Sequence, residues 1–237
     1  MSPGPWPVWH QAPDAASAAQ ALAGAVAAQL REATDRRGQA LLAVSGGRSP
    51  VAFFEALHSQ ALPWAQVTVL LADERCVLPD APDSNAALVR RHLLKGPAAA
   101  AHFLPFFDAL PATGPEQAGL AALAEARLAK LPWPLDVLVL GMGEDGHTAS
   151  LFPGAPGLEE ALSGPARVAW VRPTSAPHAR LTLTLPVLEQ ARHVHLALSG
   201  PAKRAVFERA CAQPGPALPI SLVLQRPGPP VEVWYAP

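Results

Sequence analysis

The 237-residue sequence contains few charges and no long apolar run. Charged residues make up 16% of the chain and the formal net charge is −1, so the protein has no general attraction to nucleic acid or acidic membranes. Any anion that it binds must therefore be held by a local site. No stretch approaches the roughly 18 consecutive apolar residues that cross a membrane, so we expect no membrane span.

Cysteine is also scarce. Cys76 and Cys211 lie far apart and match no metal-ligand spacing, so we expect two free thiols, a reducing compartment and no bound metal. The opening residues, MSPGPWPVWHQAPD, lack the basic end and apolar block of a signal peptide. Half of the residues are hydrophobic, which favours a compact globular chain. Together these features predict a soluble cytoplasmic protein.

Helix and strand patterns alternate along most of the sequence. Helical spacing of apolar residues predicts helices over 14–38, 50–60, 84–94, 116–131 and 201–211. Short apolar runs predict strands over 40–44, 67–72, 136–140, 167–171, 180–185 and 193–198, with ISLVL (220–224) and VEVWYA (231–236) as closing strands.

This alternation predicts an α/β fold of the Rossmann-like kind, with a mostly parallel sheet flanked by helices on both faces. No charge run, low-complexity linker or internal repeat marks a boundary, so we expect residues 1–237 to form a single catalytic domain. Ligands of such sheets bind beyond the carboxyl ends of the strands. Four polar segments follow predicted strands there: SGGRSP, DER, GMGEDGH and SGPAK.

Gly141, Gly143 and Gly146 form a G-x-G-x-x-G pattern after strand 136–140. A dinucleotide-binding turn needs a full helix after the third glycine and an acid ending the next strand. Here Pro153 and Gly154 close the only possible helix, HTASLF, after about two turns. The context therefore argues against a nucleotide cofactor.

The same glycines predict a tight turn that leads into a short helix and places His147 at the mouth of the sheet. Histidine can take a proton near neutral pH, which makes His147 a candidate base. A histidine that merely caps a loop is the alternative, and spacing alone does not separate the two interpretations.

SGGRSP has the composition of an anion-binding loop. Ser45, Gly46 and Gly47 leave a strand, Ser49 can cap the next helix, and unpaired N–H groups at that helix start favour a phosphate. The G-K-[ST] ending of a Walker loop is missing. The alternative is an ordinary turn between strand and helix.

Two further segments supply cations. In DER, strand alternation places Asp73 and Arg75 on the same side of the strand. There Arg75 can bind a phosphate and Asp73 can lie near the reacting carbon. The alternative is a local ion pair between Arg75 and the neighbouring acids. Lys203 falls in the first turn of a helix, where a cation opposes the helix dipole unless an anion binds there; a solvated surface lysine is the alternative. Arg180 is a weaker candidate.

Taken together, these segments resemble the 6-phosphogluconolactonase family, which is related to the glucosamine-6-phosphate isomerases and deaminases. The resemblance runs from about Leu41 to Trp234 and rests on five ordered motifs: SGGRSP, ADERCVLPDAPDSN, LGMGEDGHTASLFPG, RLTLTLPVL and SGPAKRAVFERA.

The resemblance implies hydrolysis of 6-phospho-D-glucono-1,5-lactone to 6-phosphogluconate, the second step of the oxidative pentose phosphate pathway, without metal or organic cofactor. It makes His147 the base that activates water and places Asp73 near the substrate or the histidine. It assigns the phosphate to Arg75, Lys203 and the loop 45–49. Arg48 departs from the family's usual small residue, and Gly143 and Gly146 shape a turn whose N–H groups can stabilise an oxyanion. We expect a monomer or a weak homo-oligomer.

Three alternatives stand beside this hypothesis. The related isomerases follow the DGH turn with IAFNEPG, whereas this chain has TASLFPG and lacks the Asn-Glu pair. A non-enzymatic sugar-phosphate sensor would usually carry a basic DNA-binding segment, which does not flank this domain. An acyl-enzyme hydrolase would need Cys76 or Ser45 in a nucleophile elbow, and neither has that context.

Overall fold

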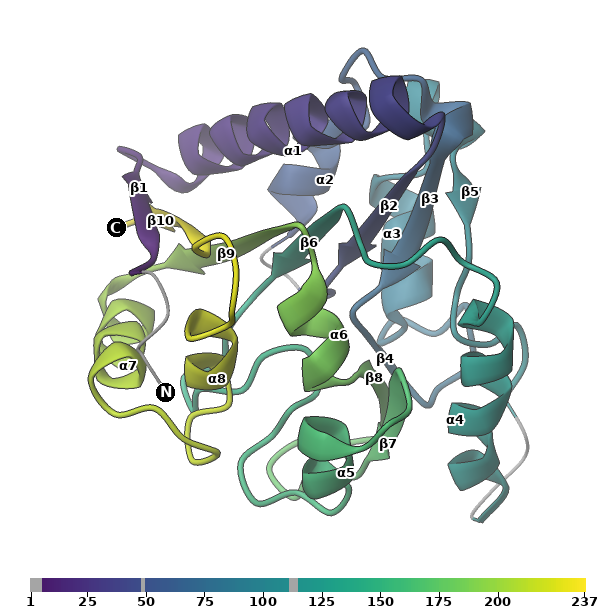
Figure 1. Cartoon of the computed structure of the whole chain (residues 1–237), viewed down its shortest axis with the longest axis vertical. Coiled ribbons are helices and arrows are strands. Elements are labelled where there is room, and N and C mark those ends of the chain that lie inside the picture. Colours follow the sequence, from purple (N-terminus) through teal and green to yellow (C-terminus); the bar gives the residue numbers. More distant parts are fainter. Residues whose placement is uncertain (1–5, 48–49, 111–114) are drawn as a thin grey trace.

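The computed structural model describes residues 6–47, 50–110 and 115–237. Within them, a seven-stranded parallel sheet with the order β1–β10–β9–β6–β2–β3–β5 forms the centre of the molecule (Figure 1). Its strands are β1 (Val8–Gln11), β2 (Ala40–Val44), β3 (Val67–Leu71), β5 (His102–Phe103), β6 (Val137–Leu140), β9 (His193–Ser199) and β10 (Glu232–Ala236). The predicted α/β fold is confirmed.

Helices cover both faces of this sheet. In Figure 1, α1 (Ala15–Arg37) crosses one face with α2 (Val51–Leu57) beside it, and α6 (Leu185–Gln190), α7 (Pro201–Ala212) and α8 (Ile220–Leu224) lie on the other. The helix α3 (Asn85–His92) packs on α2, while α4 (Pro115–Leu128) and α5 (Leu158–Ser163) pack against the smaller sheet described below. Single 3₁₀ turns occupy Trp64–Gln66 and Gly96–Ala100.

The long helix α1 shows how local sequence sets these elements. The Asp14 carboxylate accepts a hydrogen bond from the Ser17 backbone N–H at 2.7 Å, which caps the first turn. Leu22, Val26 and Leu30 are buried on one face. Gly38 ends the helix in the left-handed conformation at φ 71°, where a side chain would be strained.

The strands predicted over 167–171 and 180–185 do not join the parallel sheet. They form β7 (Val168–Val171) and β8 (Arg180–Leu183), which pair antiparallel with each other and with β4 (Asp73–Arg75) in a separate sheet. No helix lies in the connection 172–179, and a parallel pairing would need a longer crossover, so β7 and β8 form a hairpin.

Three other local predictions need correction. ISLVL, predicted as a closing strand, is the helix α8, because a short apolar run fits a buried helix as well as a strand. The segment after His147 is not a helix; Thr148 and Leu151 pair across a tight turn. The two edge strands, β1 and β5, lie in segments for which no strand was predicted.

None of the described helices combines the length and hydropathy that a membrane crossing requires. Arg48 and Ser49, both predicted to contact a phosphate, lie outside the described residues.

Candidate active site

The four polar segments meet at the carboxyl edge of the parallel sheet, as the alternation of strands and helices predicts. They surround a cleft of about 390 Å³. Its walls include these predicted site residues: Ser45, Gly46, Gly47, Asp73, Arg75, Gly143, His147, Arg180 and Lys203. A more open cavity of about 440 Å³ adjoins the cleft and shares Arg75, His147 and Arg180 with it.

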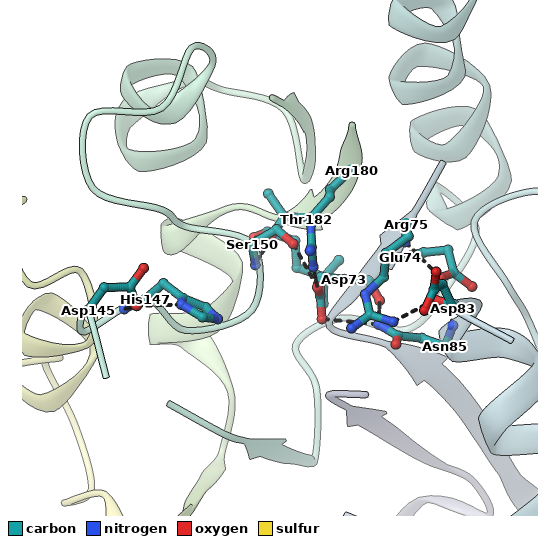
Figure 2. Close-up of polar contacts among 11 residues, drawn as sticks. Asp73, Glu74, Arg75, Asp83, Asn85, Asp145, His147, Ser150, Arg180 and Thr182 are labelled. Atoms are coloured by element: carbon teal, nitrogen blue, oxygen red, sulfur yellow. Dashed lines mark hydrogen bonds and ion pairs between the residues drawn. The ribbon is translucent and has the colours of Figure 1, made fainter. Parts of the chain in front are cut away.

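His147 stands between the two cavities on the turn that follows β6. The carboxylate oxygen Oδ1 of Asp145 lies 2.5 Å from Nδ1 of His147 and also accepts the His147 backbone N–H at 3.1 Å (Figure 2). A carboxylate at Nδ1 keeps the proton on that nitrogen, so Nε2 presents its lone pair. The arrangement suits a base.

Two glycines shape this turn. A Cβ on Gly143 would lie 2.2 Å from Nδ1 of His147 and 2.6 Å from Oδ1 of Asp145, so only glycine leaves room for the pair. Gly146 has φ 79° and packs against Leu218, away from the cleft wall.

The N–H groups of these two glycines, which belong to the turn predicted to stabilise an oxyanion, are already hydrogen-bonded within that turn. The Gly143 N–H donates to the His147 carbonyl at 2.9 Å, and the Gly146 N–H donates to the Gly143 carbonyl at 3.1 Å. Both donors are used inside the turn, because its tightness brings carbonyl oxygens onto them. Their role is therefore to shape the backbone.

Asp73 is buried at the start of β4, and its hydrogen-bond and ion-pair partners among the described residues do not include His147. One of its carboxylate oxygens accepts a hydrogen bond from Oγ of Ser150 at 2.6 Å and lies 3.8 Å from the guanidinium of Arg180 (Figure 2). Among the ion pairs of the described residues, Asp73 pairs with Arg180 and not with Arg75 on its own strand. Asp73 thus joins β4, β8 and the turn after His147.

The strand β4 separates its side chains as predicted. Asp73 and Arg75 line the cleft, whereas Glu74 points to the start of α3 and accepts the backbone N–H groups of Asn85 and Ala86 at 2.8 Å. Burial raises the pKa of Glu74, although these hydrogen bonds act in the opposite direction. Glu74 is therefore a helix cap and not a site residue. Its neighbour Arg75 donates a hydrogen bond through one terminal nitrogen to the Asp83 carbonyl at 2.5 Å.

The cleft has an excess of positive charge. Arg75, Arg180 and Lys203 line it, and within the described part of the chain only Arg180 has a carboxylate partner there. Lys203 follows β9 and Arg75 follows β3, which lie three strand spacings apart, or about 14 Å. The two cations therefore approach the cleft from opposite sides. Burial lowers the pKa of Arg180, in keeping with a charge held away from water.

Several buried polar atoms on the cleft residues have no hydrogen-bond partner among the described residues. They are Oγ of Ser45, Nε of Arg75, Oδ1 of Asn85 and Nε of Arg180. Buried polar groups of native proteins are nearly always paired, and unpaired ones call for an explanation. Their grouping around one cleft points to a polar ligand.

The loop after β2 is closely packed. A Cβ on Gly46 would lie 1.8 Å from Oδ1 of Asn85, so this position excludes any side chain. Gly47 has φ 95°, a conformation that favours glycine, with open space beside it. The glycines thus let the backbone approach both Asn85 and the cleft.

Sequence reasoning missed four residues of this region: Asp145, Asn85, Ser150 and Phe152. Asp145 had a signal, since it lies two positions before the candidate base. Asn85 and Ser150 contact Asp73, 12 and 77 positions away, and Phe152 contacts Arg180 as well as His147; a local motif shows none of these contacts.

The structure also bears on metal chemistry and on the cysteine nucleophile. Among the described residues, no group of three or more metal-ligating side chains is placed to hold a metal ion. Burial raises the pKa of the Cys76 thiol to about 12, and Cys76 lies on neither cavity wall. A thiol with such a pKa is not a nucleophile at neutral pH.

The parallel sheet carries glycine loops, cations and a His–Asp pair around one cleft at its carboxyl edge, an arrangement typical of α/β enzymes. Residues 13–233 match the family model of the glucosamine-6-phosphate isomerases/6-phosphogluconolactonase. The chain belongs to this family.

Individual relatives agree with this assignment. The chain is 52% identical over 207 residues to a 6-phosphogluconolactonase of Pseudomonas aeruginosa, covering 86% of this chain and 84% of the relative. It is 47% identical over 233 residues to one of Neisseria meningitidis, covering 97% and 99%. The crystal structure of a 6-phosphogluconolactonase from Shewanella baltica superposes with a TM-score of 0.92 at 38% identity, covering 98% of each chain.

Proposed function

We propose that this protein is a 6-phosphogluconolactonase, which hydrolyses 6-phospho-D-glucono-1,5-lactone to 6-phospho-D-gluconate in the oxidative pentose phosphate pathway. The full-length similarity to proteins of that name supports the reaction. The observation that carries the site is the His147–Asp145 pair, whose imidazole lies on the wall of a cation-lined cleft.

His147 acts as the general base in this proposal. Its Nε2 takes a proton from water as the water oxygen attacks the lactone carbonyl, which gives a tetrahedral oxyanion. The intermediate collapses by breaking the bond between C1 and the ring oxygen, and the imidazolium returns its proton to that oxygen. The product is the open-chain acid. Asp145 holds the tautomer throughout.

The phosphate is held by Arg75, Lys203 and the loop from Ser45 to Gly47, with Arg180 adding positive charge. Since the phosphate is remote from the carbonyl, its binding energy can position the ring for attack. Asp73 orients Arg180 and the turn that carries Ser150 through the contacts described above.

We also propose that the whole chain acts as one catalytic domain in the cytoplasm. The family match over residues 13–233 and the two free thiols support this placement.

Acid release from freshly generated lactone tests the function directly. The purified protein is expected to accelerate release well above the spontaneous rate, and unphosphorylated gluconolactone should be a poor substrate. A rate equal to the spontaneous one would refute the proposal. Ammonia release from glucosamine 6-phosphate, measured in parallel, would instead identify the deaminase reaction of the related enzymes.

A further inference from the structure

Asp145 constrains His147 at one point in the plane of the imidazole. A histidine side chain has two rotatable bonds, so a single in-plane contact leaves the ring free to tilt about it. A base must point its lone pair at the attacking water, and errors of about 1 Å cost roughly a hundredfold in rate. Something else must hold the face of the ring.

The face of the imidazole rests on the side chain of Phe152. The two ring centroids lie 4.0 Å apart and the planes are inclined by only 19°, which is a stacked arrangement. Phe152 itself is 3% exposed, and the guanidinium carbon of Arg180 lies 5.1 Å from its ring centroid. The phenyl ring is therefore held in place by its own surroundings.

The turn between the two rings is built to bring them together. The Leu151 N–H donates to the Thr148 carbonyl at 2.9 Å, and Oγ1 of Thr148 donates to the Gly141 carbonyl at 2.8 Å. Ala149 adopts φ 47°, a conformation that a non-glycine residue keeps only when its surroundings impose it. The bond from Ser150 to Asp73 fixes the same turn from the other side.

We propose that Phe152 is the positioning residue of the base: it fixes the plane of the His147 ring, while Asp145 fixes the tautomer and the rotation within that plane. The phenyl ring exchanges no proton and touches no reacting atom, so its contribution to the reaction acts entirely through His147. This inference rests on the proposed function, in which His147 is the base.

Three variants test the proposal. Phe152→Leu removes the aromatic face, and we expect kcat for the lactone to fall about 10- to 100-fold with little change in KM. Phe152→Tyr keeps the ring and should retain most of the activity. Phe106→Leu is the matched control, because Phe106 is also 3% exposed but lines neither cavity. It should lose stability without losing kcat.

Nuclear magnetic resonance of the His147 ring gives a readout that does not need activity. The Phe152 ring current should shift the imidazole proton signals upfield in the wild type, and Phe152→Leu should remove that shift while Phe106→Leu leaves it. If Phe152→Leu is too unstable to purify, Phe152→Met, which keeps more volume, takes its place.

An unchanged kcat in the folded Phe152→Leu protein, or equal losses in Phe152→Leu and Phe106→Leu, would overturn the positioning role. Failure of the proposed function looks different. In that case the wild type does not hydrolyse the lactone at all, whereas the ring-current shift still reports whether Phe152 orders His147.

Discussion

Oδ1 of Asp145 lies 2.5 Å from Nδ1 of His147, two positions further along the chain. Both side chains are partly exposed, at 41% and 30%, so the pair stands at the border between cleft and solvent. A pair in that position is accessible to the water that the proposed reaction consumes. The catalytic assignment therefore depends on these two neighbours, more than on the buried Asp73.

Replacing the base should remove most of the catalysis. His147→Ala is expected to lower kcat about 10²- to 10⁴-fold, the usual contribution of a general base. Asp145→Asn should cause a smaller loss, because the amide no longer fixes the tautomer. Affinity for 6-phosphogluconate, measured by calorimetry, should stay nearly constant in both variants. Near-wild-type turnover in His147→Ala would show that another residue is the base, and Asp73 would be the next residue to test.

Removing either cation should weaken phosphate binding. Arg75→Ala and Lys203→Ala are each expected to raise KM by several-fold to a hundredfold, since a hydrogen bond to a charged group contributes about 1.5–3 kcal/mol. Arg209→Ala, at the exposed far end of α7, is the matched control and should leave KM unchanged. The phosphate assignment is wrong if Arg75→Ala and Lys203→Ala weaken turnover of unphosphorylated gluconolactone by the same factor.

Adding one methyl group at Gly143 should displace the catalytic pair. The new Cβ would lie 2.2 Å from Nδ1 of His147, so Gly143→Ala is expected to lower kcat by at least tenfold while the protein stays folded. Gly24→Ala is the control, because a Cβ there meets nothing within 4 Å. Inside helix α1 it should stabilise the protein by about 0.5–1 kcal/mol. Equal activity of both variants would show that the pair tolerates the methyl group.

Acid should destabilise the fold through His195. This histidine is fully buried; its Nδ1 accepts the Trp234 indole N–H at 3.0 Å, and its Nε2 lies 2.7 Å from Oε1 of Gln29. Burial, aided by His193 and His10, lowers its pKa to about 3.

The unfolded chain binds a proton at this histidine below about pH 6.5 and the folded chain does not. Stability is therefore lost as the pH falls from about 6.5 towards 3, by at most about 1.4 kcal/mol per unit. Urea unfolding of the wild type and of His195→Gln between pH 7 and pH 4 measures how the free energy of unfolding changes with pH. The variant should show the shallower slope; parallel slopes would exclude His195 as the cause.

The local sequence alone determined much of this protein. The alternation of apolar runs and helical spacing predicted the parallel sheet, because helical spacing buries one face of a helix and a continuous apolar run suits a strand covered on both faces. Since the carboxyl ends of parallel strands share one edge, the segments after β2, β3, β6 and β9 were bound to meet there. The candidate base and the cations followed from that rule, together with the glycines that let the loops turn.

Only the tertiary structure decided how these groups pair. Asp73 and Ser150 are 77 positions apart, and Asp73 pairs with Arg180 on the neighbouring strand β8, whereas the ion pair that the sequence left open as an alternative was with Arg75. The run 220–224 became a helix, and β7 with β8 formed a second sheet. The ring of Phe152 stacks on the imidazole of His147. A short apolar run fits a helix or a strand equally well, and a buried charge can pair with several residues. Which structure and which partner occur is therefore determined by tertiary packing and by the residues that the fold brings close.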